Sequence, residues 1–204
     1  CKNKRKNRSG KRNGCRKMIA KEELNILWSL EQTAEKYEDR VAVSDVNQEL
    51  TWKELVKKAQ VIGAELSEKV QPGNPVPVLL EKSSETLAVM LGIVYAGCFY
   101  VPVNPINPTE RLRKIMEKLE PEVIISDEKG KEQLAAVGVG FEEKVIGPET
   151  LLPTTGTDLS EEQRSKLEQI QGQWKETDAL YGIFTSGSTG TPKAIVVSHG
   201  AVSR

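Results

Sequence analysis

Between residues 185 and 193 the chain concentrates the groups that a phosphate-binding loop needs. The stretch Thr185-Ser186-Gly187-Ser188-Thr189-Gly190-Thr191-Pro192-Lys193 combines hydroxyl side chains with two glycines and one lysine, and it holds no acid. Phosphates are bound by backbone N–H groups that approach closely, by hydroxyl donors and by a cation. Glycine allows the close approach because it lacks a Cβ and accepts positive φ. This composition predicts contact with phosphate groups.

The flanking residues decide between this interpretation and a flexible linker of similar composition. Before the loop stands Ala179-Leu180-Tyr181-Gly182-Ile183-Phe184, and after it stands Ala194-Ile195-Val196-Val197-Ser198. Both are short apolar runs typical of strands. We therefore expect the glycine-rich tip of a hairpin, with Lys193 at the head of the returning strand.

The loop differs from a Walker A motif, in which Gly-x-x-x-x-Gly-Lys-Ser/Thr opens directly into a helix. Pro192 stands before the lysine, and strand-like residues follow it. A P-loop nucleoside triphosphatase is therefore disfavoured.

The loop resembles the phosphate-binding signature of the AMP-forming adenylating enzymes. These include acyl-CoA synthetases, luciferases and the amino-acid adenylation domains of peptide synthetases, with the D-alanine–carrier-protein ligases. Leu50-Thr51-Trp52-Lys53-Glu54-Leu55 resembles the first core motif of adenylation domains, and Tyr95-Ala96-Gly97-Cys98-Phe99-Tyr100-Val101-Pro102-Val103-Asn104-Pro105 resembles the second. The segments follow one another in the family's order over most of the chain, and the second is most similar to amino-acid-activating members.

The resemblance implies ATP-dependent activation of a carboxylate, in particular that of an amino acid. The carboxylate attacks the α-phosphate of Mg-ATP to give an acyl-adenylate and pyrophosphate. A thiol, on coenzyme A or on the phosphopantetheine of a carrier protein, then takes the acyl group. No protein ligand for Mg²⁺ is assigned.

By motif position, the residues of the loop take the roles that the family gives them. Lys193 is the catalytic candidate, because it would balance the charge that leaves with pyrophosphate. Hydroxyl groups would bind the β- and γ-phosphates, and glycines would let the backbone approach; these positions are Thr185, Ser186, Ser188 and Thr189, with Gly187 and Gly190. Two positions depart from the family's pattern: Ala194 stands where glycine is usual, and Asn104 where aspartate is usual.

Apolar runs and helix-start signals alternate along the chain. Helices are expected over 22–37, after Thr51, where Glu54 completes a capping box, after Asn107 as N-cap, and after Ser160 with Gln163. Residues 86–103 carry no charge and raise the question of a membrane span. Gly97 divides them into a buried helix and a buried strand.

Pro75 and Pro77 indicate either that their strand lies at an edge of the sheet or that they stand at the beginning of the strand. The alternation predicts an α/β fold, a layered and largely parallel sheet with helices on both faces. In the family this is the large N-terminal domain, present here in part.

Residues 1–17 are rich in Lys and Arg and hold no acid, although the whole chain has a formal net charge of zero. We expect this basic head to be disordered or not native, a product of upstream translation or of an incomplete sequence. Residues 18–204 form the N-terminal part of an AMP-binding domain that stops after the phosphate-binding loop, so this chain alone is expected to be inactive. A remnant without catalysis, or a nucleic-acid binder that uses the basic head, remains as an alternative.

The histidine and cysteine content excludes other kinds of site. His199 is the only histidine, so a zinc site is disfavoured. It has no visible partner for general-base catalysis, and we expect it to be exposed or to cap a helix. The cysteines show no metal-ligand spacing and no disulfide framework, which fits a reducing cytoplasm. No membrane partner is expected.

Overall fold

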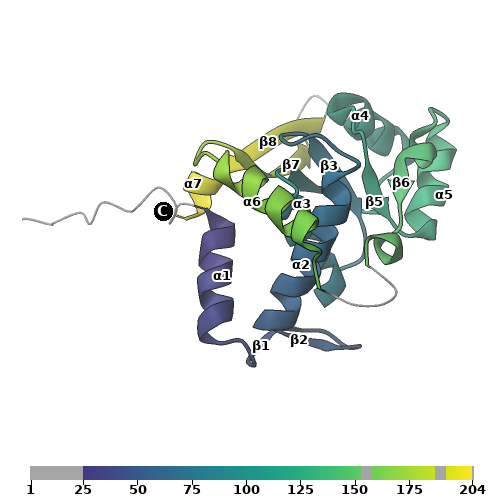
Figure 1. The fold of residues 1–204 in the computed structure, drawn as a ribbon. Coiled ribbons are helices and arrows are strands. Elements are labelled where there is room, and N and C mark those ends of the chain that lie inside the picture. Colours follow the sequence, from purple (N-terminus) through teal and green to yellow (C-terminus); the bar gives the residue numbers. More distant parts are fainter. Residues whose placement is uncertain (1–24, 153–157, 187–191, 204) are drawn as a thin grey trace, which may run out of the picture.

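The computed structural model describes residues 25–152, 158–186 and 192–203, and a six-stranded sheet lies at its centre (Figure 1). The strands are β3 (Pro75–Leu79), β4 (Phe99–Pro102), β5 (Ile124–Ser126), β6 (Val145–Ile146), β7 (Ala179–Ser186) and β8 (Pro192–Ser198). Their order is β6-β5-β3-β4-β7-β8, and every neighbouring pair is parallel except β7–β8. The predicted α/β class with a largely parallel sheet is confirmed.

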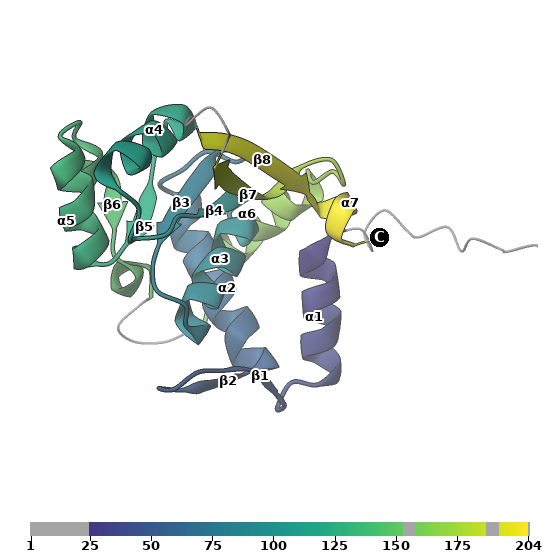
Figure 2. The ribbon, with the colours of Figure 1, turned by 180° about the vertical axis from the view of Figure 1, so that it is seen from behind.

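Helices connect the parallel strands, as such a sheet requires. They are α1 (Ile26–Lys36), α2 (Trp52–Ser67), α3 (Ser84–Tyr95), α4 (Thr109–Leu119), α5 (Glu128–Val137), α6 (Glu161–Gly172) and α7 (His199–Val202), with short 3₁₀ turns at Phe141–Lys144 and Pro148–Leu151. A separate hairpin of β1 (Val41–Ser44) and β2 (Glu49–Thr51) precedes α2. Figure 2 shows α1 at one side of the molecule, joined to this hairpin.

Helices cover both faces of the sheet. Successive side chains of a strand point to opposite faces, so neighbouring residues of one strand belong to different apolar clusters. Val76 and Val78 of β3 pack with α2 and α3 in one apolar cluster. Leu79 packs with α4 and α5 in another. A strand buried on both faces reads as an apolar run without polar alternation, which explains the composition of β3 and β5. The prediction of helices on both faces is confirmed.

The helices α2 and α3, which cover one face of the sheet, pack closely on each other, and each carries a buried glycine at the contact. A Cβ built on Gly63 would lie 2.4 Å from Tyr95 Cβ, and one built on Gly92 would lie 2.4 Å from Ile62 Cγ2. The two backbones therefore approach each other at a distance that only glycine permits. α3 carries no charge after Glu85 and ends at Tyr95; Ala96 is its C-cap, and Gly97 follows with φ +78°, which confirms the predicted stop.

Among the helices that the structure describes, none is long and apolar enough to cross a membrane.

Two of the three predicted helix caps are confirmed. Thr51 Oγ1 accepts from Glu54 N at 3.3 Å, and Glu54 Oε2 accepts from Thr51 N at 2.8 Å. Ser160 and Gln163 form the same reciprocal pair at the start of α6. The cap predicted at Asn107 is wrong, because Pro108 is the N-cap of α4 and no side chain caps that helix.

The start of one helix and the position of one strand also differ from expectation. The helix expected over 22–37 is described only from Ile26, after Asn25, whose Oδ1 caps it by accepting from Leu27 N. The strand with the two prolines is not an edge, because β3 lies between β5 and β4, but the alternative expectation holds for Pro75, which is the first residue of β3. Its ladder to β5 begins at Val78, after both prolines, so on that side their missing N–H groups are not needed.

Replacing Thr51 by alanine is expected to lower the free energy of unfolding by about 1 kcal/mol. The substitution removes the acceptor for Glu54 N and the hydroxyl that donates to Glu54 Oε2, a contact that helps to lower the pKa of Glu54. Urea denaturation checks this result. Thr109→Ala is the matched control, because Thr109 is exposed at the start of a helix without a side-chain cap; equal losses in the two variants would contradict the capping role.

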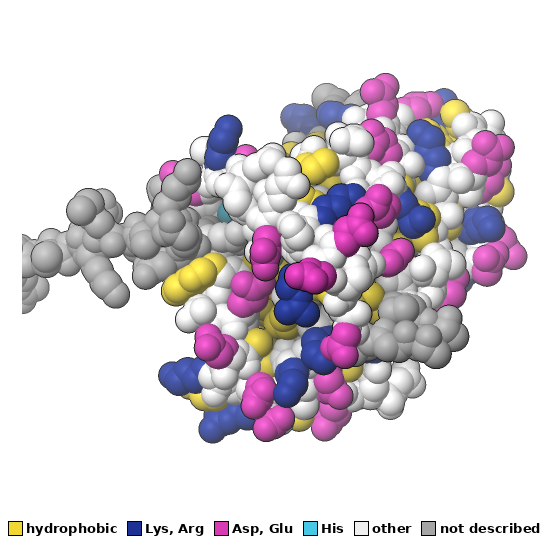
Figure 3. Space-filling view, in the orientation of Figure 1, with side chains coloured by type: hydrophobic (Ala, Val, Ile, Leu, Met, Phe, Trp, Pro, Cys, Tyr) yellow, Lys and Arg dark blue, Asp and Glu magenta, His cyan; other side chains and the backbone are white. Residues whose placement is uncertain are grey.

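The surface over α2 and α6 mixes both signs of charge (Figure 3). Lys57 Nζ lies 2.8 Å from Asp158 Oδ1, and Lys166 pairs with Glu68. Exposed ion pairs of this kind stabilise little, so the buried Leu167 is the main anchor of α6. No continuous basic patch is visible on this face. The basic head, residues 1–17, lies outside the described residues, and nucleic-acid binding by it stays a prediction.

Candidate phosphate-binding site

The strands on either side of the predicted phosphate loop form an antiparallel hairpin. The ladder of β7 and β8 runs from Ala179↔Ser198 to Thr185↔Lys193 and Ser186↔Pro192. The predicted hairpin is confirmed, and the returning strand begins at Pro192, so Lys193 lies inside it. The loop positions between the strands, Gly187, Ser188, Thr189, Gly190 and Thr191, lie outside the described residues, and their predicted roles are not tested.

The hairpin is fixed to the sheet through β4. β7 runs parallel to β4 with Tyr100 opposite Tyr181, and the two rings stack with centroids 5.8 Å apart. Gly182 packs so closely that a Cβ there would lie 3.2 Å from Val101 Cγ2. Because β7 is parallel to β4, its carboxyl end leads into the loop at the edge where open α/β sheets bind ligands. Sequence analysis did not identify these anchoring residues; only the aromatic positions in the two strands hinted at them.

Thr185 and Lys193 are the described residues that this arrangement offers to a ligand. They are direct cross-strand partners, and both side chains are exposed. Residues 179–198 contain no Asp or Glu, so no carboxylate on the hairpin opposes an anion. A hydroxyl donor and an ammonium group side by side fit the oxygens of a polyphosphate. The hairpin itself supplies no carboxylate ligand for a metal ion.

The structure accommodates both residues that depart from the family's pattern, Ala194 and Asn104, without a clash. Ala194 lies in β8 opposite Phe184 with its side chain exposed, so its methyl group meets open surface. Asn104 follows β4, where its Oδ1 accepts from Ile106 N at 2.9 Å and its carbonyl oxygen accepts from Asn107 N at 3.1 Å. An aspartate side chain can accept the same bond, so the change to asparagine removes a charge and keeps the turn.

His199 does not belong to this site, and the prediction that it is exposed or caps a helix is wrong. It follows β8 at the end opposite the loop, and it is fully buried. Its ring packs edge-on against Trp174 with centroids 3.8 Å apart. Burial lowers the pKa of the imidazole to about 4, and nearby Asp178 and the backbone of Ala179 only partly oppose this shift.

Cys98 is likewise a packing residue. Its side chain is buried, and Sγ donates to the carbonyl oxygen of Gln71 at 3.3 Å. Burial raises the pKa of the thiol to about 12, so the reactive thiolate is suppressed.

Comparison with known proteins gives the class to which this fold and hairpin belong. The family model described as AMP-binding enzyme matches residues 30–204. The chain belongs to the AMP-binding enzyme family, as its motifs predicted.

Its curated relatives are peptide synthetases. The chain is 33% identical over 170 residues to bacitracin synthase 1 of Bacillus licheniformis, and the match covers 83% of this chain and 3% of that protein. It is 30% identical over 185 residues to the nonribosomal peptide synthetase SIDC of Beauveria bassiana, with 86% of this chain and 4% of that protein covered. The chain thus spans a small fraction of the length of these relatives.

Solved structures agree with the fold. The nonribosomal peptide synthetase FmoA3 in an AMPPNP-bound form superposes with a TM-score of 0.69 at 26% identity, over 88% of this chain and 18% of that chain. VinN superposes with a TM-score of 0.69 at 24% identity, over 85% of this chain and 45% of that chain.

Proposed function

We propose that residues 18–204 form the N-terminal, phosphate-binding part of an adenylation domain that activates an amino acid with ATP. The carrying observation is the hairpin at the carboxyl edge of the sheet, where Thr185 stands opposite Lys193. The relatives support the choice of substrate class, since they are synthetases of peptides. The AMPPNP-bound form of FmoA3 supports ATP as the nucleotide.

The reaction joins two anions, and its chemistry explains why a cation is needed. A carboxylate oxygen of the amino acid bonds to the α-phosphorus of ATP, and the bond from that phosphorus to the bridging oxygen breaks. Pyrophosphate leaves with the electron pair of the broken bond. Lys193 offsets the negative charge that collects on this leaving group. The hydroxyl groups of Thr185 and Ser186, with the loop residues Gly187 to Gly190, hold the phosphates.

A thiol then accepts the acyl group from the adenylate. The synthetase relatives favour the phosphopantetheine of a carrier protein over coenzyme A as its source. ATP and a free thiol are both supplied by a reducing cytoplasm, and we place the reaction there.

Lys193→Ala is expected to weaken ATP binding by the chain about tenfold or more, because a bond from a charged donor is lost. Amide chemical shifts measured by nuclear magnetic resonance during an ATP titration test this result, and they should change first at Thr185 and Lys193. Lys36→Ala, in the last turn of α1, is the matched control and should bind ATP as the native chain does. Equal affinity of the Lys193→Ala variant, or shifts confined to other elements, would contradict the proposal.

A further inference from the structure

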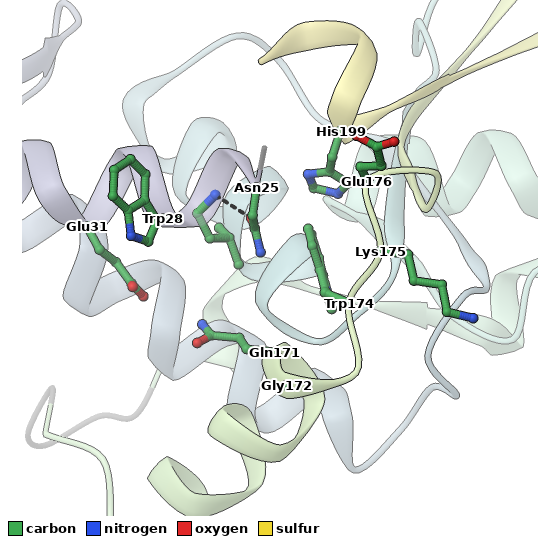
Figure 4. Close-up of a pocket in the computed structure, with 10 residues that line it drawn as sticks. Asn25, Trp28, Glu31, Gln171, Gly172, Trp174, Lys175, Glu176 and His199 are labelled. Atoms are coloured by element: carbon green, nitrogen blue, oxygen red, sulfur yellow. Dashed lines mark hydrogen bonds between the residues drawn. The ribbon is translucent and has the colours of Figure 1, made fainter. Parts of the chain in front are cut away.

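A second cavity lies away from the phosphate-binding hairpin. It has a volume of about 310 Å³ and is enclosed by α1, the end of α6, the segment that leads to β7, and His199 (Figure 4). His199 and Trp174 stand on one side, with Trp28 and Glu31 on the other. This volume is at the small end of ligand pockets.

His199 provides the evidence that this cavity holds a ligand. Its side chain is 0% exposed, and neither Nδ1 nor Nε2 forms a hydrogen bond of acceptable geometry among the described residues, although the backbone of Ala179 is near enough to act on the pKa of the ring. A neutral imidazole carries one donor and one acceptor, and buried polar atoms of folded proteins are almost always paired. His199 is among the residues that line the cavity, so the cavity is the side from which a partner approaches the ring.

The other walls define the shape of such a partner. Trp174 packs against the imidazole, and Trp28, 38% exposed, lines the cavity from α1 on the far side of Asn25, so two indole rings contribute to its wall. Flat aromatic groups pack well against such surfaces. Asn25 uses its Oδ1 to accept from Leu27 N at 2.7 Å, and its amide nitrogen remains on the cavity side.

Charge narrows the class further. Glu31 accepts a hydrogen bond of 2.9 Å from the hydroxyl of the buried Tyr95, which holds its carboxylate at the cavity wall. Glu176 adds a second carboxylate to the wall and Lys175 one ammonium group, so the charged side chains that line the cavity sum to a net negative charge, which disfavours an anionic occupant.

We infer that the cavity binds a planar aromatic group that carries a hydroxyl or an N–H and no negative charge. The group packs against the indole rings of the cavity wall, those of Trp174 and Trp28, and forms a hydrogen bond with the ring of His199. A free aromatic compound and an aromatic side chain of a peptide present the same chemistry. The cavity lies at the end of β8 away from Lys193, so it is distinct from the proposed phosphate-binding hairpin.

Binding can be observed on His199 directly. The chain has one histidine, so its ring ¹⁵N resonances are identified without assignment. Phenol added to the 204-residue chain is expected to shift these resonances. Toluene, which has the same shape without the donor, should bind about tenfold more weakly. The absence of any shift with phenol or with N-acetyl-tyrosinamide would overturn the inference.

N-acetyl-tyrosinamide distinguishes the two sources of the aromatic group. Binding about tenfold tighter than that of phenol would identify a peptide side chain as the occupant. Binding equal to or weaker than that of phenol would identify a small aromatic compound. Both results support the site.

Variants separate binding from folding. His199→Phe should bind phenol and toluene equally, as measured by calorimetry, and a retained preference for phenol would overturn the role of His199. Trp28→Ala should weaken phenol binding about tenfold, and because Trp28 is partly exposed this variant keeps the test valid if His199→Phe does not fold. Trp52→Phe, in the first turn of α2, is the control and should bind phenol as the native chain does. Equal binding by Trp28→Ala would also overturn the inference.

Discussion

Gly92→Ala is expected to destabilise the chain by about 1–3 kcal/mol, and larger side chains at this position by more. An added Cβ would lie 2.4 Å from Ile62 Cγ2, 2.6 Å from Ile62 Cβ and 3.1 Å from the carbonyl oxygen of Ala59. Ile62 is fully buried at the centre of the cluster that covers the sheet, so it has no space to move into. The helices must separate, and both then lose contact with β3.

Urea denaturation of the native chain and the variant measures this loss. Gly172→Ala is the matched control: Gly172 is the last residue of α6, and an added Cβ there meets nothing within 4 Å. The control should be neutral, or more stable by a few tenths of a kcal/mol, because alanine favours a helix. A Gly92→Ala variant as stable as the native chain would show that α2 and α3 can separate without cost.

Acid is expected to destabilise the chain through His199. The pKa of the imidazole is about 4 in the folded chain, against 6.5 for an ordinary histidine such as that of the unfolded chain. As the pH falls, the unfolded chain therefore takes up the proton first. The full stability is therefore present above pH 6.5 and is lost progressively as the pH falls towards 4. One pKa unit corresponds to about 1.4 kcal/mol, so the loss amounts to about 3 kcal/mol.

The measurement is the free energy of unfolding in urea over this pH range, with His199→Gln as the comparison. The chain has one histidine, so the difference between the two curves belongs to this side chain. Asp45 acts in the same direction at lower pH, because hydrogen bonds from Ser84, Asn47 and Gln48 lower its pKa. Asp45→Asn separates its part. Parallel curves for the native chain and His199→Gln would refute the prediction.

Local signals predicted much of the fold. The reciprocal pair of Thr51 and Glu54, the stop at Gly97 and the β7–β8 hairpin are encoded within a few residues, and the structure has them where the sequence indicates. The cap at Asn107 was wrong for a local reason too, since Pro108 takes the N-cap position itself.

Long-range packing explains the features that were not predicted. The burial of His199 depends on Trp174, which α6 and the following turn bring against it. The interior position of β3 depends on β4 and β5 pairing on its two sides. The strands β7 and β8 show where the loop begins and ends, but they do not show what the loop binds. The phosphate contacts therefore stay predictions; they concern Thr185, Ser186, Gly187, Ser188, Thr189, Gly190 and Lys193.

The outer edge of β8 has a consequence for the behaviour of the chain in solution. β8 is the last strand in the sheet, and among the described residues nothing pairs with its outer side. Ile195 and Val196 are 47% and 56% exposed along it, and Ile183 of β7 lies beside them. An apolar edge strand with free N–H and C=O groups is a template for pairing with another chain. Two copies that meet at this edge would join their sheets into one, so association should increase with protein concentration.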